Sequence, residues 1–156
     1  MFAAARSLLI IASMALVADA KVTRKVISTP DAPPAIGPYS QGIIVGFGSG
    51  DEGMTYVAGQ IGMLVNGTLV PGGIGPETHQ LMKNIGNILH AAGSSFEDVV
   101  ECHCMLADIK EYAAFNAEYA KSFASSAGAP VRAAYEVSAL PKGARAEVKC
   151  TATWDK

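Results

Sequence analysis

Residues 129–148 read APVRAAYEVSALPKGARAEV and predict two strands separated by a tight turn. Apolar and polar residues alternate on both sides of Leu-Pro-Lys-Gly, where proline restricts one backbone angle and glycine can take a positive φ. The pattern therefore favours a β-hairpin. In the first arm, Arg132 falls on the opposite face from Val131 and Tyr135 and is expected to point away from the helical core. The return arm carries Glu147.

Arg132 is the candidate binding residue of this stretch. It stands at the start of a strand, just after Gly-Ala-Pro. A guanidinium group holds both oxygens of a carboxylate in one plane, which suits a site for a small carboxylic acid. The alternative is a solvated surface arginine, the common state of a charged residue on a strand.

The rest of the chain alternates strand-like and helix-like segments. Apolar residues recur at the helical period from Pro76 until Gly93, which ends a helix. A second helix is expected to start at Asp108, which has capping-box spacing to Glu111, and to end near Gly128. Further strands are expected at residues 21–28, 42–47, 54–61 and 100–106.

This order of elements predicts one α+β domain over residues 21–156, with two helices packed on one face of a single mixed sheet. The other face of the sheet is left open and carries mixed small and polar residues. Open faces of this kind are commonly covered by another copy of the same chain.

Composition limits the classes of function. Half of the 156 residues are hydrophobic, enough for a core, and a net charge of −2 argues against a nucleic-acid partner. The three cysteines are an odd count without zinc-finger spacing, so a disulfide framework is not expected. Cys102 and Cys104 alternate with Glu101 and His103 along one strand, which splits these groups between two faces. We therefore expect two buried thiols and no metal site.

Residues 1–20 have the composition of a cleaved secretory signal. One basic residue precedes an apolar run at 8–17, and small residues follow at Ala18-Asp19-Ala20. The run is too short to span a bilayer, so no membrane partner is expected for the mature chain. A mitochondrial presequence is the alternative. Asn66-Gly67-Thr68 is an N-glycosylation sequon, although an Asn-Gly hairpin corner explains it equally well.

Several short motifs occur in one order along the chain. They are IGPYSQ at 36–41, AGQ at 58–60, FNAEY at 115–119, PVRAAYEV at 130–137, LPKG at 140–143 and Glu147. Together they resemble the Rid family, the reactive intermediate deaminases also called YjgF or UK114 proteins. The resemblance runs from about Val22 to Trp154. It implies a chorismate-mutase-like fold and a homotrimer with three clefts between subunits.

The resemblance also implies the roles of particular residues. Arg132 would bind the substrate carboxylate, and Glu147 would position a water molecule. Tyr39 would form an aromatic wall, while Gly59 and Ala134 would line the cleft. Asn116 is a further candidate for substrate binding, with three roles open to it: exposure to solvent, a hydrogen bond to a neighbouring loop, or reach into a site across an interface.

The implied activity is hydrolytic deamination of 2-aminoacrylate and 2-iminobutanoate to 2-ketoacids and ammonia, with no metal or organic cofactor. The chain departs from many members at Ala58 and Val131, where serine and alanine are frequent, and from some bacterial members at Ala134, where they have cysteine. The alternatives are a non-catalytic ligand-binding or chaperone-like trimer and a translation-inhibiting endoribonuclease. Members of the family are generally cytosolic or organellar, so mitochondrion and cytosol stand beside the secretory pathway as possible compartments.

Overall fold

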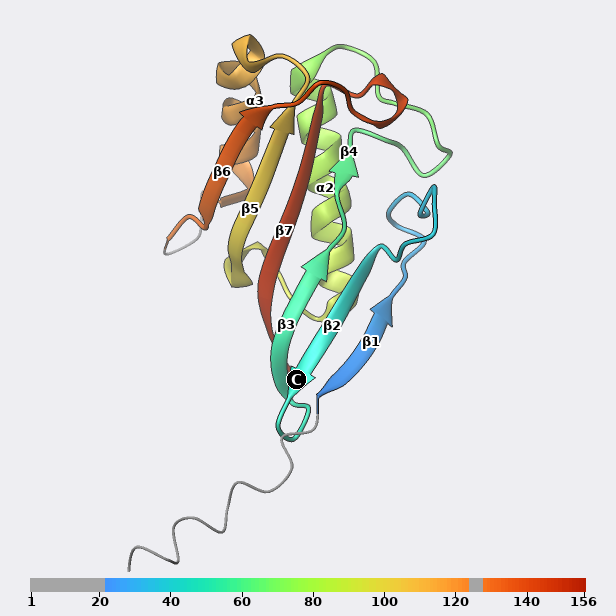
Figure 1. Ribbon diagram of the computed structural model, residues 1–156, viewed down its shortest axis with the longest axis vertical. Coiled ribbons are helices and arrows are strands. Elements are labelled where there is room, and N and C mark those ends of the chain that lie inside the picture. Colours follow the sequence, from blue (N-terminus) through green and yellow to red (C-terminus); the bar gives the residue numbers. More distant parts are fainter. Residues whose placement is uncertain (1–21, 124–127) are drawn as a thin grey trace, which may run out of the picture.

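The computed structural model describes residues 22–123 and 128–156, and residues 1–20 lie outside the described residues. It consists of one sheet with helices on one side (Figure 1). The strands are β1 (Thr23–Ile27), β2 (Gly42–Phe47), β3 (Glu52–Val57), β4 (Gln60–Ile61), β5 (Val99–Leu106), β6 (Val131–Glu136) and β7 (Ala146–Asp155). The prediction of a strand at 54–61 is right except that the strand is interrupted at Ala58 and Gly59.

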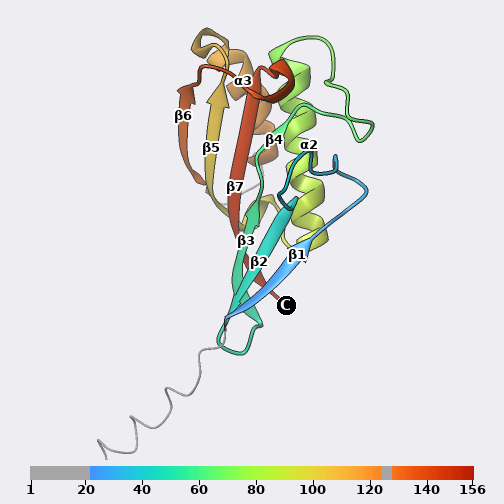
Figure 2. The same ribbon diagram turned by 45° about the vertical axis from the view of Figure 1, so that its right-hand side comes forward.

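The sheet is mixed, as predicted. Its strand order is β1-β2-β3-β7-β5-β6, and β4 also pairs with β7. Only the β5–β6 pair is parallel among these pairs, while the others are antiparallel. The long central strand β7 therefore joins the two halves of the sheet, as Figure 2 shows.

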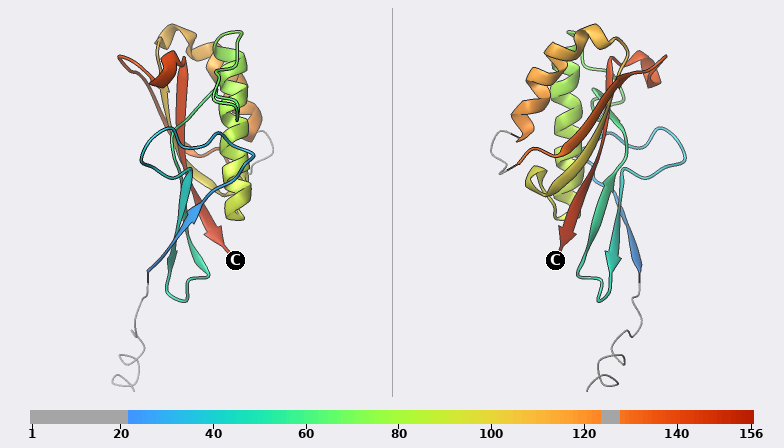
Figure 3. Two further views of the ribbon diagram at one scale, coloured as in Figure 1. Left: turned by 90° about the vertical axis from the view of Figure 1, so that its right-hand side faces the viewer. Right: turned by 60° about the vertical axis from the view of Figure 1, so that its left-hand side comes forward.

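Both predicted helices are present and cover the same face of the sheet (Figure 3). Helix α2 (Ile74–Ala92) ends at Gly93, which has the left-handed φ of 86° that a glycine tolerates. Helix α3 (Tyr112–Tyr119) continues into a 3₁₀ turn at Ala120–Phe123. Side chains of α2, α3, β5 and β7 form most of the core between the layers, including Leu81, Ile85, Ile88, Leu89, Phe115, Cys104, Leu106, Val148 and Ala152.

The predicted hairpin at 129–148 is wrong. Strand β6 does not pair with β7, because β5 lies between them and pairs with both. The chain leaves β6 and returns to β7 through residues 137–145, which contain a 3₁₀ turn at Pro141–Gly143. Strand β5 carries a row of fully buried side chains, so a central place between β6 and β7 removes more of its apolar surface from water than an edge would.

The prediction of two free buried thiols in β5 is also wrong. Cys102 lies directly opposite Cys150 in the β5–β7 register, and the two form a disulfide. Cys104 remains a free and fully buried thiol. Spacing along the sequence does not show which strands are neighbours, so this pairing could not be read from it.

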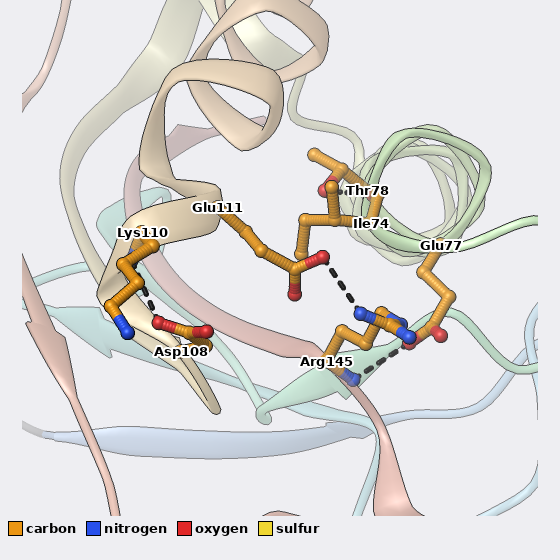
Figure 4. Close-up of polar contacts among 7 residues, drawn as sticks. All are labelled: Ile74, Glu77, Thr78, Asp108, Lys110, Glu111 and Arg145. Carbon is orange, nitrogen blue, oxygen red and sulfur yellow. Dashed lines mark hydrogen bonds and ion pairs between the residues drawn. The ribbon is translucent and has the colours of Figure 1, made fainter.

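Two carboxylates anchor the end of the 137–145 connection (Figure 4). The backbone N–H of Arg145 donates to Oε2 of Glu77 at 2.8 Å. The guanidinium of Arg145 donates to Oε1 of Glu111 at 2.7 Å. Asp108 accepts from the N–H of Lys110 at 2.9 Å, as a capping residue does. The predicted capping box is incomplete, because Glu111 turns to Arg145 and thereby ties the start of β7 to the start of α3.

The sheet face away from the helices carries exposed large side chains. Alternation along the strands places them opposite the buried core residues. They are Val26, Phe47, Tyr56, Val131 and Tyr135. None of the helices in residues 22–123 and 128–156 is long and apolar enough to cross a membrane.

Candidate active site

Three of the predicted site residues meet in one pocket. The proline-rich segment, residues 29–38, precedes β2 and folds over one end of the sheet. It encloses a cavity of about 300 Å³. Tyr39, Gly59 and Glu147 all line it. The remaining wall is mostly apolar and is formed by Pro33, Pro34, Ala35, Ile36, Gln41, Ala58, Gln60, Ile61, Met63 and Pro141.

Glu147 lies directly against the backbone of Gly59. A Cβ atom built at Gly59 would stand 1.9 Å from Oε1 of Glu147, so no side chain fits there while the carboxylate keeps its position. The lack of a side chain at position 59 is thus explained by Glu147. Burial raises the pKa of the Glu147 carboxyl above its ordinary value of 4.5.

Gln41, which was not among the predicted site residues, holds the proline-rich segment in place. Its amide oxygen accepts from the N–H of Thr29 at 2.7 Å. Its Nε2 lies 3.0, 3.1 and 2.9 Å from the carbonyl oxygens of Thr29, Ala32 and Pro33. One buried amide thus bonds the backbone of a segment rich in residues that lack N–H groups. The signal for Gln41 in the sequence was a polar residue placed between the proline-rich segment and an apolar strand.

Tyr39 lies at the edge of the first pocket. Its side chain is half exposed, and its hydroxyl accepts a hydrogen bond from the N–H of Ile36 at 3.2 Å. This bond closes the tip of the proline-rich segment, so the phenol is held at the pocket mouth.

Arg132 lies in a second pocket, of about 490 Å³, between β6 and α3. Its Nη1 donates to Oδ1 of Asn116 at 2.8 Å, and its Nη2 donates to the hydroxyl of Tyr112. Its guanidinium carbon stands 4.7 Å from the centroid of the Tyr119 ring. Arg132 therefore has two neutral acceptors and the rings of two tyrosines, Tyr112 and Tyr119, around it, all supplied by α3.

The prediction that Arg132 points away from the helices is wrong. In the parallel β5–β6 register, Arg132 is the partner of Cys102, whose side chain is buried on the helical side. In-register neighbours share a face, so Arg132 points toward α3. Asn116 bonds Arg132 of β6 in its own chain and lines the same pocket, a contact that was not among the roles considered for it.

Tyr112 and Tyr119 contact Arg132 from α3 and were not among the predicted site residues. The hydroxyl of Tyr119 is buried and has no hydrogen-bond partner in the described structure. Burial raises its pKa, and burial likewise raises the pKa of the Cys104 thiol to about 12. Ala134, the β6 partner of Cys104, packs against the core and lines neither pocket.

The two pockets do not join within one chain. Glu147 alternates with Ala146 and Val148, which are fully buried against the helices, so its carboxylate lies on the opposite sheet face from Arg132. Strand β5 separates the two residues. Within the described residues there is no group of three or more histidine, cysteine, aspartate or glutamate side chains placed to hold a metal ion.

Comparison with known proteins identifies the class that has this fold. The family described as endoribonuclease L-PSP matches residues 29–154. The chain belongs to this family, which is the Rid, or YjgF, family that its motifs resemble. The predicted α+β class is the fold of solved structures of the family.

Individual relatives cover most of the chain. It is 47% identical over 132 residues to the bovine 2-iminobutanoate/2-iminopropanoate deaminase, spanning 84% of this chain and 90% of the relative. The structure of RidA from an Antarctic Psychrobacter has 34% identity and a TM-score of 0.73, covering 82% of this chain and 98% of that one. The structure of Escherichia coli TdcF with bound serine has 31% identity and a TM-score of 0.72, covering 82% and 97%.

Proposed function

We propose that this chain is a hydrolytic deaminase of short 2-imino and 2-enamine acids, such as 2-iminobutanoate and 2-aminoacrylate. The proposal is supported by the name of the bovine relative, with which the chain shares nearly half of its residues over most of its length. It is supported independently by an arginine and a carboxylate in separate pockets, the two groups that a carboxylate-bearing imine and its attacking water require.

The observation that carries the proposal further is the separation of Arg132 from Glu147 on opposite faces of the sheet. One chain cannot hold a three- or four-carbon acid between them. We infer that the enzyme is a homotrimer, in which Arg132 of one copy faces the pocket of Glu147 and Tyr39 in the next. The exposed apolar side chains of the open sheet face, among them Val131 and Tyr135, would be buried between the copies.

In this assembly Arg132 binds the substrate carboxylate. Two of its five N–H donors are occupied by Asn116 and Tyr112, which leaves donors for a bidentate contact. The Tyr119 ring beneath the guanidinium fixes its plane further. The imine carbon next to the carboxylate is thereby held at a set distance from Arg132.

Glu147 orients the attacking water. The water oxygen forms a bond to the imine carbon while the imine nitrogen gains a proton, which gives a carbinolamine. Collapse of the carbinolamine converts its C–OH into the C=O of the 2-ketoacid, with the hydroxyl proton passing to the nitrogen, and breaks the C–N bond so that ammonia leaves. A buried carboxylate with a raised pKa can accept the water proton and return it to the leaving nitrogen. Positioning and charge pairing supply the rate enhancement, and the reaction itself requires no metal or organic cofactor.

The test is release of 2-oxobutanoate and ammonia in the presence of a threonine dehydratase that generates 2-iminobutanoate. The mature chain should shorten the lifetime of the imine and accelerate ketoacid release. An unchanged imine lifetime with folded protein would contradict the proposal and favour a ligand-binding trimer. A parallel incubation with single-stranded RNA tests for endoribonuclease activity, which the name of the family implies. The net charge of −2 does not favour this activity.

A further inference from the structure

The segment Asn66-Gly67-Thr68 forms an exposed turn between β4 and α2. The chain enters and leaves it through an isolated antiparallel bridge between Met63 and Leu69. Asn66 and Thr68 are exposed, and a Cβ atom built at Gly67 would have no atom within 4 Å. A bulky group attached at this turn therefore has open space in the chain.

The hydrogen bonds of the turn leave one atom of Asn66 unused. Oδ1 of Asn66 accepts both the N–H of Thr68, at 3.1 Å, and the hydroxyl of Thr68, at 2.7 Å. The amide nitrogen Nδ2 makes no hydrogen bond to any described residue. The Thr68 hydroxyl polarises the amide through its oxygen and leaves the nitrogen of this exposed residue available. That nitrogen is the atom to which an N-linked glycan is attached.

The disulfide is an independent observation about the compartment. Cys102 and Cys150 are joined between the neighbouring strands β5 and β7 and are almost completely buried. Disulfides persist in oxidising compartments, above all in the secretory pathway, and are rare in the cytosol. The signal-like composition of residues 1–20 points to the same route.

We propose that Asn66 carries an N-linked glycan, attached as the chain enters the secretory pathway. In the transfer, Nδ2 of Asn66 forms a bond to the anomeric carbon of an N-acetylglucosamine whose oligosaccharide is carried by a polyisoprenoid pyrophosphate. The bond between that carbon and the pyrophosphate oxygen breaks. The lipid pyrophosphate leaves, and the amide loses one proton to the solvent. No oxidant or reductant is needed.

The glycan is compatible with the candidate active site. Asn66 lines neither the pocket of Glu147 nor that of Arg132. The proposal rests on no part of the deaminase mechanism, and its test does not use deaminase activity.

The experiment expresses the full chain, including residues 1–20, in a cultured animal cell and collects the medium. The secreted wild-type protein should lose apparent mass on treatment with peptide N-glycosidase. Asn66→Gln and Thr68→Ala should show no such shift, while Thr68→Ser, which keeps the sequon and the hydroxyl, should retain it. Mass spectrometry after the treatment should find deamidation confined to position 66.

The variants also separate glycan loss from misfolding. Asn66→Gln and Thr68→Ala break the turn in different ways. If both variants are secreted and folded and neither loses apparent mass on treatment with peptide N-glycosidase, the sequon is the attachment site. Secreted wild-type protein that shows no shift would overturn the proposal. Protein retained in the cells with its N-terminus beginning at Met1 would overturn it as well.

Discussion

Arg132 and Glu147 lie on opposite faces of one sheet, with β5 between their strands. Each has its own pocket and its own supporting residues. This relationship makes the deaminase proposal testable at the level of single side chains, because damage to one pocket should leave the other unchanged.

Arg132→Lys should abolish most imine hydrolysis in a protein that still folds. Lysine keeps the charge but cannot bind a carboxylate through two parallel N–H donors, and it has no planar group to lie over Tyr119. Loss of one charge-assisted contact costs about 1.5–3 kcal/mol, which corresponds to roughly tenfold to a hundredfold in kcat/KM. The measurement is coupled ketoacid release, with thermal melts for folding. Arg24→Lys is the matched control on exposed β1, and equal activity of both variants would refute the assignment of Arg132.

Tyr112→Phe should raise KM for the imino acid more than it lowers kcat. The change removes only the hydroxyl that accepts from Nη2 of Arg132, so the guanidinium loses part of its orientation while the ring remains. A neutral or charge-assisted hydrogen bond of this kind is worth about 1–2 kcal/mol, or roughly fivefold to thirtyfold in KM.

The effect of Tyr112→Phe should vanish in an Arg132→Lys background, since the hydroxyl acts through Arg132. An equal loss in both backgrounds would show that Tyr112 acts otherwise. Tyr119→Phe provides a stability comparison, because it removes a buried hydroxyl that has no hydrogen-bond partner among the described residues and should leave the melting temperature equal or higher.

Glu147→Gln should lower kcat by about a hundredfold or more, the usual contribution of a general base. Because burial raises the pKa of Glu147, the acid limb of the wild-type pH profile should lie above pH 4.5, and the variant should lack it. A wild-type profile that is flat through this range would contradict the assigned role.

The same change should not destabilise the protein at neutral pH. A raised pKa in the folded state means that the folded chain binds this proton more tightly than the unfolded chain does. The resulting stability is present below the unfolded pKa and is lost as pH rises through the folded pKa. The ionised carboxylate is therefore a cost at neutral pH, which the neutral amide removes. Thermal melts of both proteins at acid and neutral pH check the sign.

Thiol labelling should distinguish the three cysteines. Native protein should not react with a thiol reagent, because Cys104 is fully buried and its pKa is raised to about 12. Denaturation without reductant should expose only Cys104, and reduction should then expose Cys102 and Cys150 as well. Three reactive thiols in oxidised, denatured protein would show that the disulfide does not form.

The sequence predictions were right where a structure depends on residues close in the chain, and wrong where it depends on contacts between distant segments. The helix that ends at Gly93 and the strand around His103 were predicted correctly, because periodicity and end signals act between residues close in the chain. The strand expected at 54–61 is interrupted at Gly59, and the side chain that lies against this glycine, Glu147, is far along the sequence.

The errors concern contacts between distant segments. The alternation in 129–148 was correct for each strand, yet nothing local shows that β5 lies between β6 and β7. The side of the sheet that Arg132 faces depends on its parallel register with Cys102, and the disulfide depends on the antiparallel register of Cys102 with Cys150. Tyr112 has the signature of a core residue, so its bond to Arg132 could not be distinguished from packing.

The most direct test of the account mixes two inactive proteins, Arg132→Lys and Glu147→Gln, under conditions that dissociate and reassemble the oligomer. In a trimer whose clefts combine Arg132 of one copy with Glu147 of the next, each mixed trimer contains one intact cleft, so random mixing should restore about a quarter of the wild-type activity. Reassembly of either variant alone should restore none. Mixed trimers without recovered activity would contradict an active site built from two chains.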